Sequence, residues 1–343
     1  MEKVKVVLYG VGAVGSRIAK FLLENEGVEI VGAIDIAEDK VGKDLGEILG
    51  LNNQLGIAVS NNPDDVFSRV KADIIVHATT SSFKEAYPQI AKAVEHGGNV
   101  VSTCEELAYP YTVEPELAQK LDELAKEHEV TVLGTGINPG FLMDTLAITL
   151  TGVCQKVERI KVTRIINAAK RRVPFQKKIG AGLSVKEFRD RIERKTITGH
   201  VGLEQSISMI ASALGWELDE IEVDPVDPVV AKASVESEAI RVKTGQVAGL
   251  RQCSRGIMGR REVITLDFQA YMNAEVEYDS ISIEGVPGLH MKIAPCVHGE
   301  IGTVAIIVNS IPKVLKASTG LVTMKDLPIP SAVLKHMRKY VRQ

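Results

Sequence analysis

The first half of the chain alternates between short apolar runs and longer segments with helical spacing. The apolar runs predict strands at residues 4–9, 29–35, 73–79, 99–103 and 130–134. Segments with helical character lie between them at residues 16–24, 83–95 and 115–128. This order of elements predicts an α/β domain in which helices flank a doubly wound parallel sheet.

Further along the chain, longer strands appear in which apolar and polar positions alternate. Such strands are predicted at residues 159–166 and 263–272, together with helices at 185–194 and 203–214. We therefore expect a second domain of the α+β class, built on a mostly antiparallel sheet. One face of this sheet is expected to be available for the partner subunit of a homodimer.

The last part of the chain contains an apolar segment of helix length at residues 299–312. We expect this segment to return to the first domain. The predicted organisation is a first domain at 1–148, a second domain at 149–297 and a C-terminal helical segment at 298–343. No internal repeat or low-complexity linker interrupts the chain, so a cleft between two domains is expected.

Composition is that of a globular protein with a large core. Of the 343 residues, 45% are hydrophobic and 25% charged, which suits about two domains. No apolar run reaches the roughly 18 residues of a membrane span, and the chain begins with a strand, so a cytoplasmic protein is expected. The net charge of −3 argues against a nucleic-acid partner. The four cysteines are scattered, which predicts reduced thiols and no metal site.

Three glycines mark the turn between the first strand and the first helix. Gly10 permits a tight turn, Gly12 lets the backbone approach a pyrophosphate, and Gly15 allows the helix and the strand to pack closely. Ala13 and Val14 complete the motif, where free N–H groups of the helix face the negative charge. Because a strand precedes the turn and a helix follows it, the motif predicts a Rossmann-type dinucleotide-binding domain.

Asp35 ends the second predicted strand, about 20 residues beyond Gly15. A carboxylate at this place accepts hydrogen bonds from an adenosine ribose, which favours NAD. The alternative is a solvated aspartate at a strand end. NADP also remains possible, because Lys40 and Lys43 follow and can reach a 2′-phosphate. Ile36 stands where an arginine would favour NADP more strongly.

In an open α/β sheet, ligands gather beyond the carboxyl ends of the strands. Thr79 and Thr80 follow one strand, and their hydroxyls can border the cofactor. Their neighbours Ser81 and Ser82 offer another interpretation, the N-cap of the next helix.

The loop at 134–144 is rich in glycine and is expected to pass close to the nicotinamide ring. Asn138 can bind the carboxamide or a polar group of the substrate, and Phe141 is a candidate substrate contact in the same loop. The alternative is an ordinary turn, since Asn-Pro-Gly favours one.

Two adjacent acids, Glu105 and Glu106, follow the strand at 99–103. Neighbouring like charges resist ionising together, and desolvation raises a carboxyl pKa, so one of the two is a candidate base. The alternative is an acid in the first turn of a helix, which we expect for one of them. Glu105 is closer to the strand and is the preferred catalytic residue, with Glu106 as the second choice.

Arg164 lies on the apolar face of its predicted strand, where a charge requires a partner. A buried ion pair and a substrate carboxylate are equally good interpretations. Arg172 and Lys178 belong to a short basic cluster at 170–178 that suits an anion better than a nucleic acid. His200 can carry a proton, although a lone histidine is more often a hydrogen-bonded structural residue.

Several segments together resemble the 2,4-diaminopentanoate dehydrogenase family, which includes native amine dehydrogenases and has a dihydrodipicolinate-reductase-like fold. They are the glycine turn at 10–15 and the segments 41–47, 103–107, 134–144, 171–183, 308–312 and 320–328. The middle and C-terminal segments are much more specific than the glycine turn. The resemblance extends over nearly the whole chain.

The resemblance implies NAD(P)-dependent oxidative deamination of the C4 amine of 2,4-diaminopentanoate to 2-amino-4-oxopentanoate, a step of ornithine breakdown. Hydride leaves C4 of the neutral amine, and ionised Glu105 then activates the water that releases ammonia. Arg164, helped by Arg172 or Lys178, would bind the distal carboxylate.

Other functions remain open at this point. Dihydrodipicolinate reductases resemble this chain in fold, but they usually carry a paired-histidine motif, and no two histidines are adjacent here. Homoserine dehydrogenases have a lysine in place of Glu105. An aldehyde dehydrogenase could use Cys104, although two neighbouring acids make it a poor thiolate. A non-catalytic NAD-binding protein is the alternative from a different class.

Overall fold

The computed structural model describes residues 2–341, and the chain divides into two compact units. The first unit is built from Met1–Phe141 and Gly299–Gln343, and the second from Leu142–His298. The division falls before the boundary expected at residue 148. As a result, α6 (Thr145–Thr151) belongs as a whole to the second unit.

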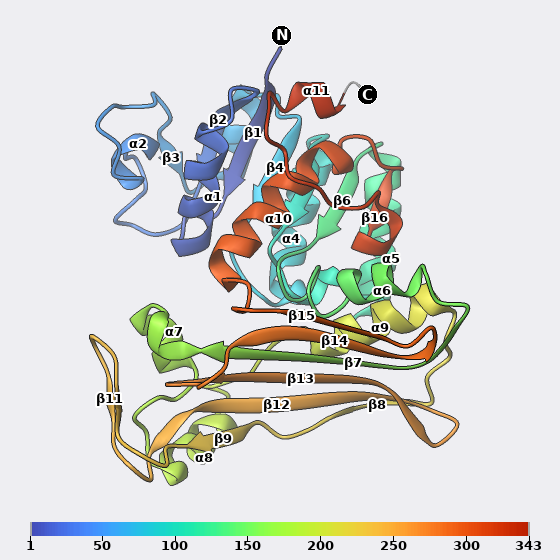
Figure 1. The fold of residues 1–343 in the computed structure, drawn as a ribbon. Helices are drawn as coiled ribbons and strands as arrows, with labels where there is room; N and C mark the ends of the chain where they lie inside the picture. Colours follow the sequence, from blue (N-terminus) through green and yellow to red (C-terminus); the bar gives the residue numbers. More distant parts are fainter. Residues whose placement is uncertain (1, 342–343) are drawn as a thin grey trace. The chain divides into compact units, whose positions relative to one another are not determined.

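Seven parallel strands form the sheet of the first unit, in the order β16-β6-β5-β4-β1-β2-β3 (Figure 1). The strands are β1 Val4–Tyr9, β2 Val28–Ile34, β3 Val59–Ser60, β4 Ile74–His77, β5 Asn99–Ser102, β6 Thr131–Gly134 and β16 Gly320–Val322. The direction of the strand order reverses between β1 and β4, which are neighbours. Sheets of this kind bind their ligands at such a reversal.

Helices cover both faces of this sheet, with α1 and α10 in front and α4 and α5 behind in Figure 1. The helices are α1 Ala13–Leu23, α2 Leu45–Ile48, α3 Pro63–Arg69, α4 Phe83–Glu95, α5 Pro115–Glu127, α10 Gly299–Val314 and α11 Arg338–Val341, and the 3-10 turns are η1 Glu106–Ala108 and η3 Met324–Asp326. Ile75, Ile90 and Val100 belong to the buried core between the sheet and α4. The β-branched residues of the central strands suit this two-sided burial.

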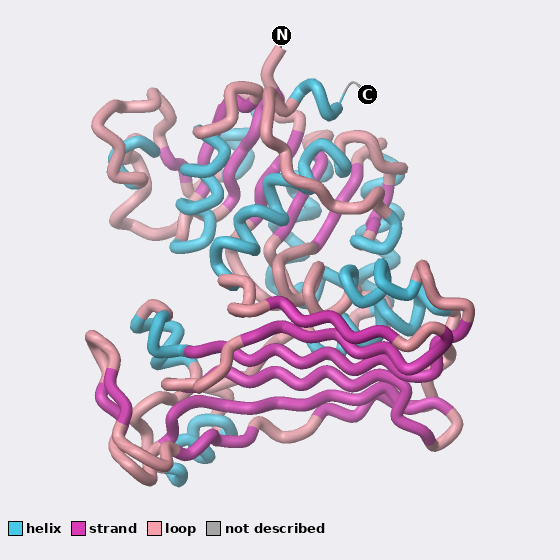
Figure 2. The backbone as a smooth tube through the Cα atoms, in the orientation of Figure 1, coloured by secondary structure: helices cyan, strands magenta, loops and turns pink. Residues whose placement is uncertain are grey.

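The second unit is built on a sheet with the strand path β15-β14-β7-β13-β12-β8, and β9 pairs with β12 (Figure 2). Neighbouring strands are antiparallel except β7 and β13, which are parallel. The strands are β7 Lys156–Asn167, β8 Glu220–Val223, β9 Asp227–Val230, β12 Val247–Met258, β13 Arg261–Tyr271, β14 Tyr278–Val286 and β15 Leu289–Ile293, and β10 Val235–Glu236 pairs separately with β11 Arg241–Val242. The helices are α6, α7 Val173–Lys178, α8 Val185–Glu193 and α9 Leu203–Leu214, with the 3-10 turn η2 Ala168–Lys170. Helix α9 packs against β8, β12 and β13.

The fold class predicted from the sequence is confirmed. A parallel sheet between helices forms the first unit, and a mostly antiparallel sheet forms the second. The sequence pattern predicts that the first helix begins at residue 16, but α1 begins at Ala13. Gly12 is its N-cap residue, so the last residues of the glycine motif already belong to the helix. The edge strands β3 and β16, of 2 and 3 residues, were not predicted because they are too short to show a period.

Within residues 2–341, no helix combines the length and the apolar character that crossing a membrane requires.

Candidate active site

The turn between β1 and α1 has no room for a side chain at two of its glycines. A Cβ atom on Gly10 would lie 2.4 Å from the carbonyl oxygen of Ala78, and one on Gly15 would lie 2.0 Å from the carbonyl oxygen of Gly10. Gly10 also has a φ of +99°, which residues with a side chain rarely adopt. The turn is therefore packed tightly against both the end of β4 and the first turn of α1.

Gly12 has a different environment, because no atom lies within 4 Å of the place where its Cβ would be. It is the N-cap residue of α1, and no side chain caps this helix. Ala13 and Val14 form the first turn behind it. The first N–H groups of α1 have no partner within the helix, and an open helix N-terminus of this kind binds phosphate.

A cavity of about 370 Å³ lies beside this turn. The turn and α1 contribute one side of it, and Lys40 and Lys43 contribute to the other. The lining also contains Asp39 and Glu47, and Lys43 pairs with Glu47 at 3.5 Å, so the open N–H groups of α1 are what favour a phosphate here. The residues around the turn therefore fit the pyrophosphate of a dinucleotide.

Asp35 follows β2 directly, and its side chain is 10% exposed. Its carboxylate accepts hydrogen bonds from the N–H groups of Val11 at 2.8 Å and Ala37 at 2.9 Å, and it pairs with Lys40 Nζ at 3.0 Å. Burial alone would raise the pKa of Asp35, but these hydrogen bonds outweigh burial and hold the pKa below its usual value. Asp35 is therefore ionised at neutral pH and is fixed to the glycine turn.

A polar network centred on the buried His77 connects the ends of β4 and β5. His77 Nδ1 lies 2.8 Å from Ser102 Oγ, and Nε2 lies 2.9 Å from Gln89 Oε1. Nε2 is also 2.9 Å from Thr79 Oγ1, which donates a hydrogen bond to Gln89 Oε1 at 2.7 Å. Burial lowers the pKa of His77 to about 4, so the imidazole is neutral at physiological pH. The network fixes the orientation of the exposed Thr79.

The N-terminus of α4 is capped by a residue from another segment. Ser82 is the N-cap residue, but its side chain makes no cap hydrogen bond. Instead, the N–H of Phe83 donates to Glu106 Oε2 at 2.7 Å. Thr80 Oγ1 donates to Glu85 Oε2 at 2.7 Å and accepts from the N–H of Ser82 at 3.3 Å.

Glu105 lies just before η1, at the carboxyl end of β5, and is partly exposed. Within residues 2–341 its carboxylate forms no hydrogen bond and no ion pair. The carboxylates of the two adjacent acids therefore differ in their hydrogen bonding. Glu106 is bound to the first turn of α4, whereas the carboxylate of Glu105 can bind a ligand.

Cys104 precedes these acids and is fully buried, with its thiol donating to the carbonyl oxygen of Ser81 at 3.2 Å. Burial, reinforced by the charges of Glu105 and Glu106, raises the pKa of Cys104 to about 12. The side chain is therefore a neutral thiol at physiological pH. This argues against the alternative in which Cys104 is the nucleophile of an aldehyde dehydrogenase.

The loop after β6 carries Asn138 and Phe141, both partly exposed. Gly140 has a φ of +121°, and a Cβ there would lie 2.5 Å from the backbone nitrogen of Gly136. The loop is thus folded tightly on itself. Thr135 at its start donates from its N–H to the carbonyl oxygen of Ser102 at 2.9 Å, which connects the loop to the end of β5.

Arg164 lies in β7 of the second unit and is 2% exposed. Its guanidinium forms an ion pair with Asp279, opposite it on β14, and donates to the carbonyl oxygen of Val297 at 2.7 Å. Of the two interpretations of Arg164, the structure contains the buried ion pair. We correct its assignment accordingly, because a guanidinium this deeply buried needs a compensating carboxylate and Asp279 provides it.

His200 stacks on Phe268, with ring centroids 4.3 Å apart. Burial, with further contributions from Lys178 and Arg164, lowers the pKa of His200 to about 3. The imidazole is therefore neutral at physiological pH, which favours a structural role. Lys178 at the end of α7 and Arg172 just before its start are both exposed.

The candidates of the first unit all lie beyond the carboxyl ends of parallel strands. The glycine turn follows β1, and Asp35, Thr79, Glu105 and Asn138 follow β2, β4, β5 and β6 respectively. The candidates Arg164, Arg172 and Lys178 belong to the second unit.

Three buried or partly buried partner residues do not follow from the sequence pattern. Ser102 and Gln89 hold His77, and Asp279 holds Arg164. His77 and Ser102 end adjacent strands in register, so polar residues at matching strand ends were the available signal. Asp279 is 115 residues from Arg164 in the chain, and no local pattern connects them.

Comparisons with known proteins cover both parts of the chain. Residues 141–343 match the family model described as the 2,4-diaminopentanoate dehydrogenase C-terminal domain. Residues 4–135 match the model described as the N-terminus of dihydrodipicolinate reductase. The chain is 37% identical to the 2,4-diaminopentanoate dehydrogenase of Acetoanaerobium sticklandii, over 100% of this chain and 98% of that protein.

The chain is also similar to solved structures of an amine dehydrogenase and of a dihydrodipicolinate reductase. The amine dehydrogenase from Mycobacterium smegmatis superposes with a TM-score of 0.84 at 31% identity, covering 97% of this chain and 98% of that one. A dipicolinate-bound dihydrodipicolinate reductase from Paenisporosarcina sp. TG-14 has a TM-score of 0.53 at 12% identity, covering 94% and 98% of the two chains. The latter similarity concerns the fold alone.

Because Gly12 and Gly15 have different environments, alanine at Gly15 should lower stability, whereas alanine at Gly12 should lower the affinity for NADH. Gly15→Ala forces a Cβ against the carbonyl of Gly10 and should destabilise the protein by about 1–3 kcal/mol in urea unfolding. Gly12→Ala should cost no more than about 1 kcal/mol, because its Cβ would meet no other atom and the loss comes from alanine being a poorer N-cap residue than glycine. It should instead weaken NADH binding, measured by fluorescence titration, by roughly tenfold or more, because the methyl group occupies the place of the pyrophosphate. Unchanged NADH affinity in Gly12→Ala would contradict this assignment.

Proposed function

Because the chain belongs to the 2,4-diaminopentanoate dehydrogenase family, we propose that it catalyses the oxidative deamination of 2,4-diaminopentanoate at C4. The products are 2-amino-4-oxopentanoate and ammonia, and the reaction is a step of ornithine breakdown. The observation that carries this proposal is the 37% identity to a 2,4-diaminopentanoate dehydrogenase over the whole chain. The geometry at the carboxyl edge of the first sheet agrees with such a reaction.

The cofactor site is formed by the glycine turn and Asp35. Gly10, Gly12, Ala13, Val14 and Gly15 surround the place of the pyrophosphate, and ionised Asp35 accepts hydrogen bonds from the ribose. Thr79, Thr80 and Asn138 border the remainder of the dinucleotide. When bound, the nicotinamide supplies the acceptor for the hydride that leaves C4 of the substrate.

Glu105 is the proposed general base. Loss of hydride leaves an iminium carbon at C4, and the carboxylate of Glu105 takes a proton from the water that attacks it. The protonated Glu105 then returns this proton to the amine of the carbinolamine. As the C–N bond breaks and ammonia leaves, the carboxylate takes the proton of the carbinolamine hydroxyl and the C4 carbonyl forms. A carboxylate without a hydrogen bond or ion pair in residues 2–341 is suited to this exchange, whereas the carboxylate of Glu106 is occupied by the N–H of Phe83.

Arg172 and Lys178 are the proposed ligands of the substrate carboxylate. Both are exposed, Arg172 just before the start of α7 and Lys178 at its last residue. Phe141 is the proposed apolar contact of the substrate. Arg164 is no longer part of this set, because its guanidinium is paired with Asp279.

The dihydrodipicolinate reductase alternative has weaker support. The curated reductases that match this chain cover between 23% and 41% of it. The C-terminal 203 residues match the diaminopentanoate dehydrogenase model instead, as the range 141–343 shows. The substrate-binding part of the chain is thus of the amine dehydrogenase kind.

For the cofactor, we propose that NAD is preferred and that NADP is also accepted. Asp35 favours the ribose hydroxyls of NAD, and Lys40 and Lys43 line the adjoining cavity, where a 2′-phosphate can be bound. The ion pair between Lys40 and Asp35 offsets part of the negative charge that would repel this phosphate.

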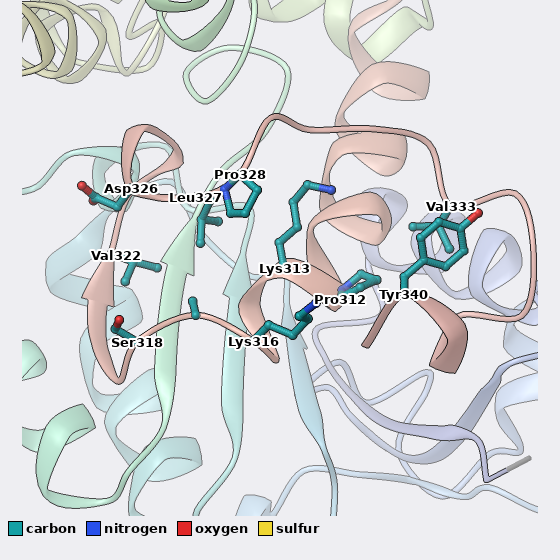
Figure 3. A pocket seen from close by; sticks show the side chains of 11 residues that line it. Pro312, Lys313, Lys316, Ser318, Val322, Asp326, Leu327, Pro328, Val333 and Tyr340 are labelled. Carbon is teal, nitrogen blue, oxygen red and sulfur yellow. The ribbon is translucent and has the colours of Figure 1, made fainter. Parts of the chain in front are cut away.

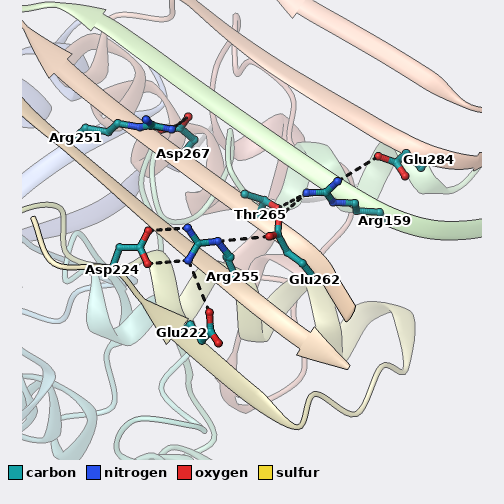
Figure 4. A network of polar contacts seen from close by, with 9 residues as sticks. All are labelled: Arg159, Glu222, Asp224, Arg251, Arg255, Glu262, Thr265, Asp267 and Glu284. Atoms are coloured by element: carbon teal, nitrogen blue, oxygen red, sulfur yellow. Dashed lines mark hydrogen bonds and ion pairs between the residues drawn. The ribbon is translucent and has the colours of Figure 1, made fainter. Parts of the chain in front are cut away.

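We also propose a homodimer formed through the sheet of the second unit. On one face of this sheet, arginines and carboxylates from several strands form ion pairs (Figure 4). Arg255 binds Asp224 through two hydrogen bonds of 2.7 Å, and Arg251 binds Asp267 at 2.9 and 3.0 Å. Charges that are already paired can be covered by a second copy at a smaller cost than isolated ones.

The same face has a hollow of about 570 Å³ at one end, lined by aliphatic and aromatic residues together with polar ones such as Lys232 and Glu275. Ile165, Tyr271 and Tyr278 lie in it, and Val230 at its margin is 42% exposed. Aromatic residues in a hollow, next to satisfied charges, are typical of interface centres. A second copy of this chain is the proposed occupant.

The adjacent acids provide a matched pair for testing the mechanism. Glu105→Gln should lower the rate of NADH formation with 2,4-diaminopentanoate by about 10²–10⁴-fold, because the amide cannot take a proton. Glu106→Gln should keep activity within about tenfold, but it should lose roughly 0.5–2 kcal/mol of stability through the weaker cap of α4. Equal loss of activity in both variants would contradict the separate roles.

Cofactor choice can be tested with Lys40→Ala and Lys43→Ala. Removing a cation near the 2′-phosphate should raise the KM for NADP roughly tenfold and change the KM for NAD by no more than about twofold. Initial rates with both cofactors measure this directly. Parallel changes for NAD and NADP would show that the lysines do not discriminate between the two.

If the dimer forms through this face, negative charges introduced into the hollow should separate the two copies. Sedimentation should give twice the monomer mass for the wild type and the monomer mass for a variant with Val230→Asp and Val276→Asp. Val153→Asp is the control, because Val153 is 68% exposed but lies outside the hollow. A monomeric wild type, or a double variant that stays dimeric, would overturn the interface.

A further inference from the structure

The C-terminal segment of the first unit forms a second cavity, of about 460 Å³, that the proposed reaction does not use (Figure 3). Its walls come from the end of α10, the strand β16 and the segment that follows η3. The apolar lining includes Pro312, Val322, Leu327 and Tyr340. Cavities of this volume with mostly apolar walls are typical of small-molecule sites.

Two lysines contribute the cationic part of this cavity. Figure 3 shows Lys313 with its side chain between Pro328 on one side and Val333 on the other. Lys316 follows the end of α10 and also lines the cavity. Within residues 2–341, neither ammonium forms an ion pair with a carboxylate.

Lys313 is the less exposed of the two lysines, and burial lowers the pKa of its ammonium. Its hydrogen-bond partner is the hydroxyl of Ser331, at 3.3 Å from Nζ. The one acid in the lining, Asp326, is bound instead by Thr323 and Lys325. A partly buried cation with only a hydroxyl for a partner is incompletely compensated, and an anion would complete it.

The cavity is separate from the dinucleotide site within the same unit. In the first turns of α10, Glu300 pairs with Arg17 of α1, and Thr303 accepts from the N–H of Ile137 at 3.4 Å. Lys313 lies in the last turn of this 16-residue helix, about 20 Å along its axis. The two cavities share no residue.

From these observations, we propose that the cavity at the end of α10 binds a small amphipathic carboxylate. The carboxylate would accept hydrogen bonds from Lys313 and Lys316, and a short aliphatic or aromatic chain would contact Val322, Leu327 and Tyr340. A purely apolar ligand would leave the ammonium groups unpaired. A small inorganic anion would leave most of the apolar wall uncovered.

The test is calorimetric titration of the full-length enzyme with 3-phenylpropanoate, compared with the neutral 3-phenylpropanamide. Saturating NADH and 2,4-diaminopentanoate are present, so that the proposed substrate site is occupied and binding there is not measured. The acid should bind and the amide should bind at least tenfold more weakly. Hydrogen exchange should slow in residues 312–333 and not in residues 10–48.

Substitutions distinguish this site from unspecific anion binding. Lys313→Met keeps the aliphatic stem, removes the charge, and should weaken binding of the acid about tenfold. Its melting temperature should not fall, because it removes a desolvated charge, and Lys316→Met provides a second variant. Lys20→Met is the control, since Lys20 also lies in the last turn of a helix but outside the cavity. Absence of binding, equal binding of acid and amide, or equal effects of Lys313→Met and Lys20→Met would each overturn the proposal.

Discussion

The close contact between the glycine turn and the end of β4 is the constraint on which the first unit depends. Gly10 and Gly15 leave no space for side chains, so α1 begins at a fixed place beside the sheet. The carboxylate of Asp35 binds the N–H of Val11 and holds the end of β2 at the same point. Because of these contacts, the open N-terminus of α1 and the ionised carboxylate of Asp35 are held close together, as the binding of a dinucleotide requires.

At the ends of β4 and β5, hydrogen bonds and burial give neighbouring polar side chains different environments. Of the two adjacent acids, Glu106 caps α4, whereas the carboxylate of Glu105 forms no hydrogen bond or ion pair within residues 2–341. Burial keeps the thiol of Cys104 and the imidazole of His77 neutral at physiological pH. At the end of β5, the carboxylate of Glu105 is partly exposed and forms no hydrogen bond or ion pair in the described part of the chain. This division supports a base-assisted release of ammonia.

The sequence predicted the fold class because its periodic segments are long and separated by clear turns. It also predicted the glycine turn and its three separate steric demands, since these follow from local spacing. The role of Glu106 could not be predicted, because its partner Phe83 is 23 residues away and becomes a neighbour only through strand order. For Arg164, the sequence indicated that the buried guanidinium needs a partner, but it could not identify Asp279 as that partner. Short edge strands such as β16 were missed because three residues carry no period.

In the proposed reaction, hydride passes directly from C4 of an amine to a nicotinamide held at this turn. The most direct measurement uses 2,4-diaminopentanoate deuterated at C4, with wild-type enzyme and NAD. Direct transfer predicts one deuterium in each NADH, formed together with one ammonia and one 2-amino-4-oxopentanoate. Ammonia release without NADH, or deuterium found in the product or in water instead of the cofactor, would contradict it.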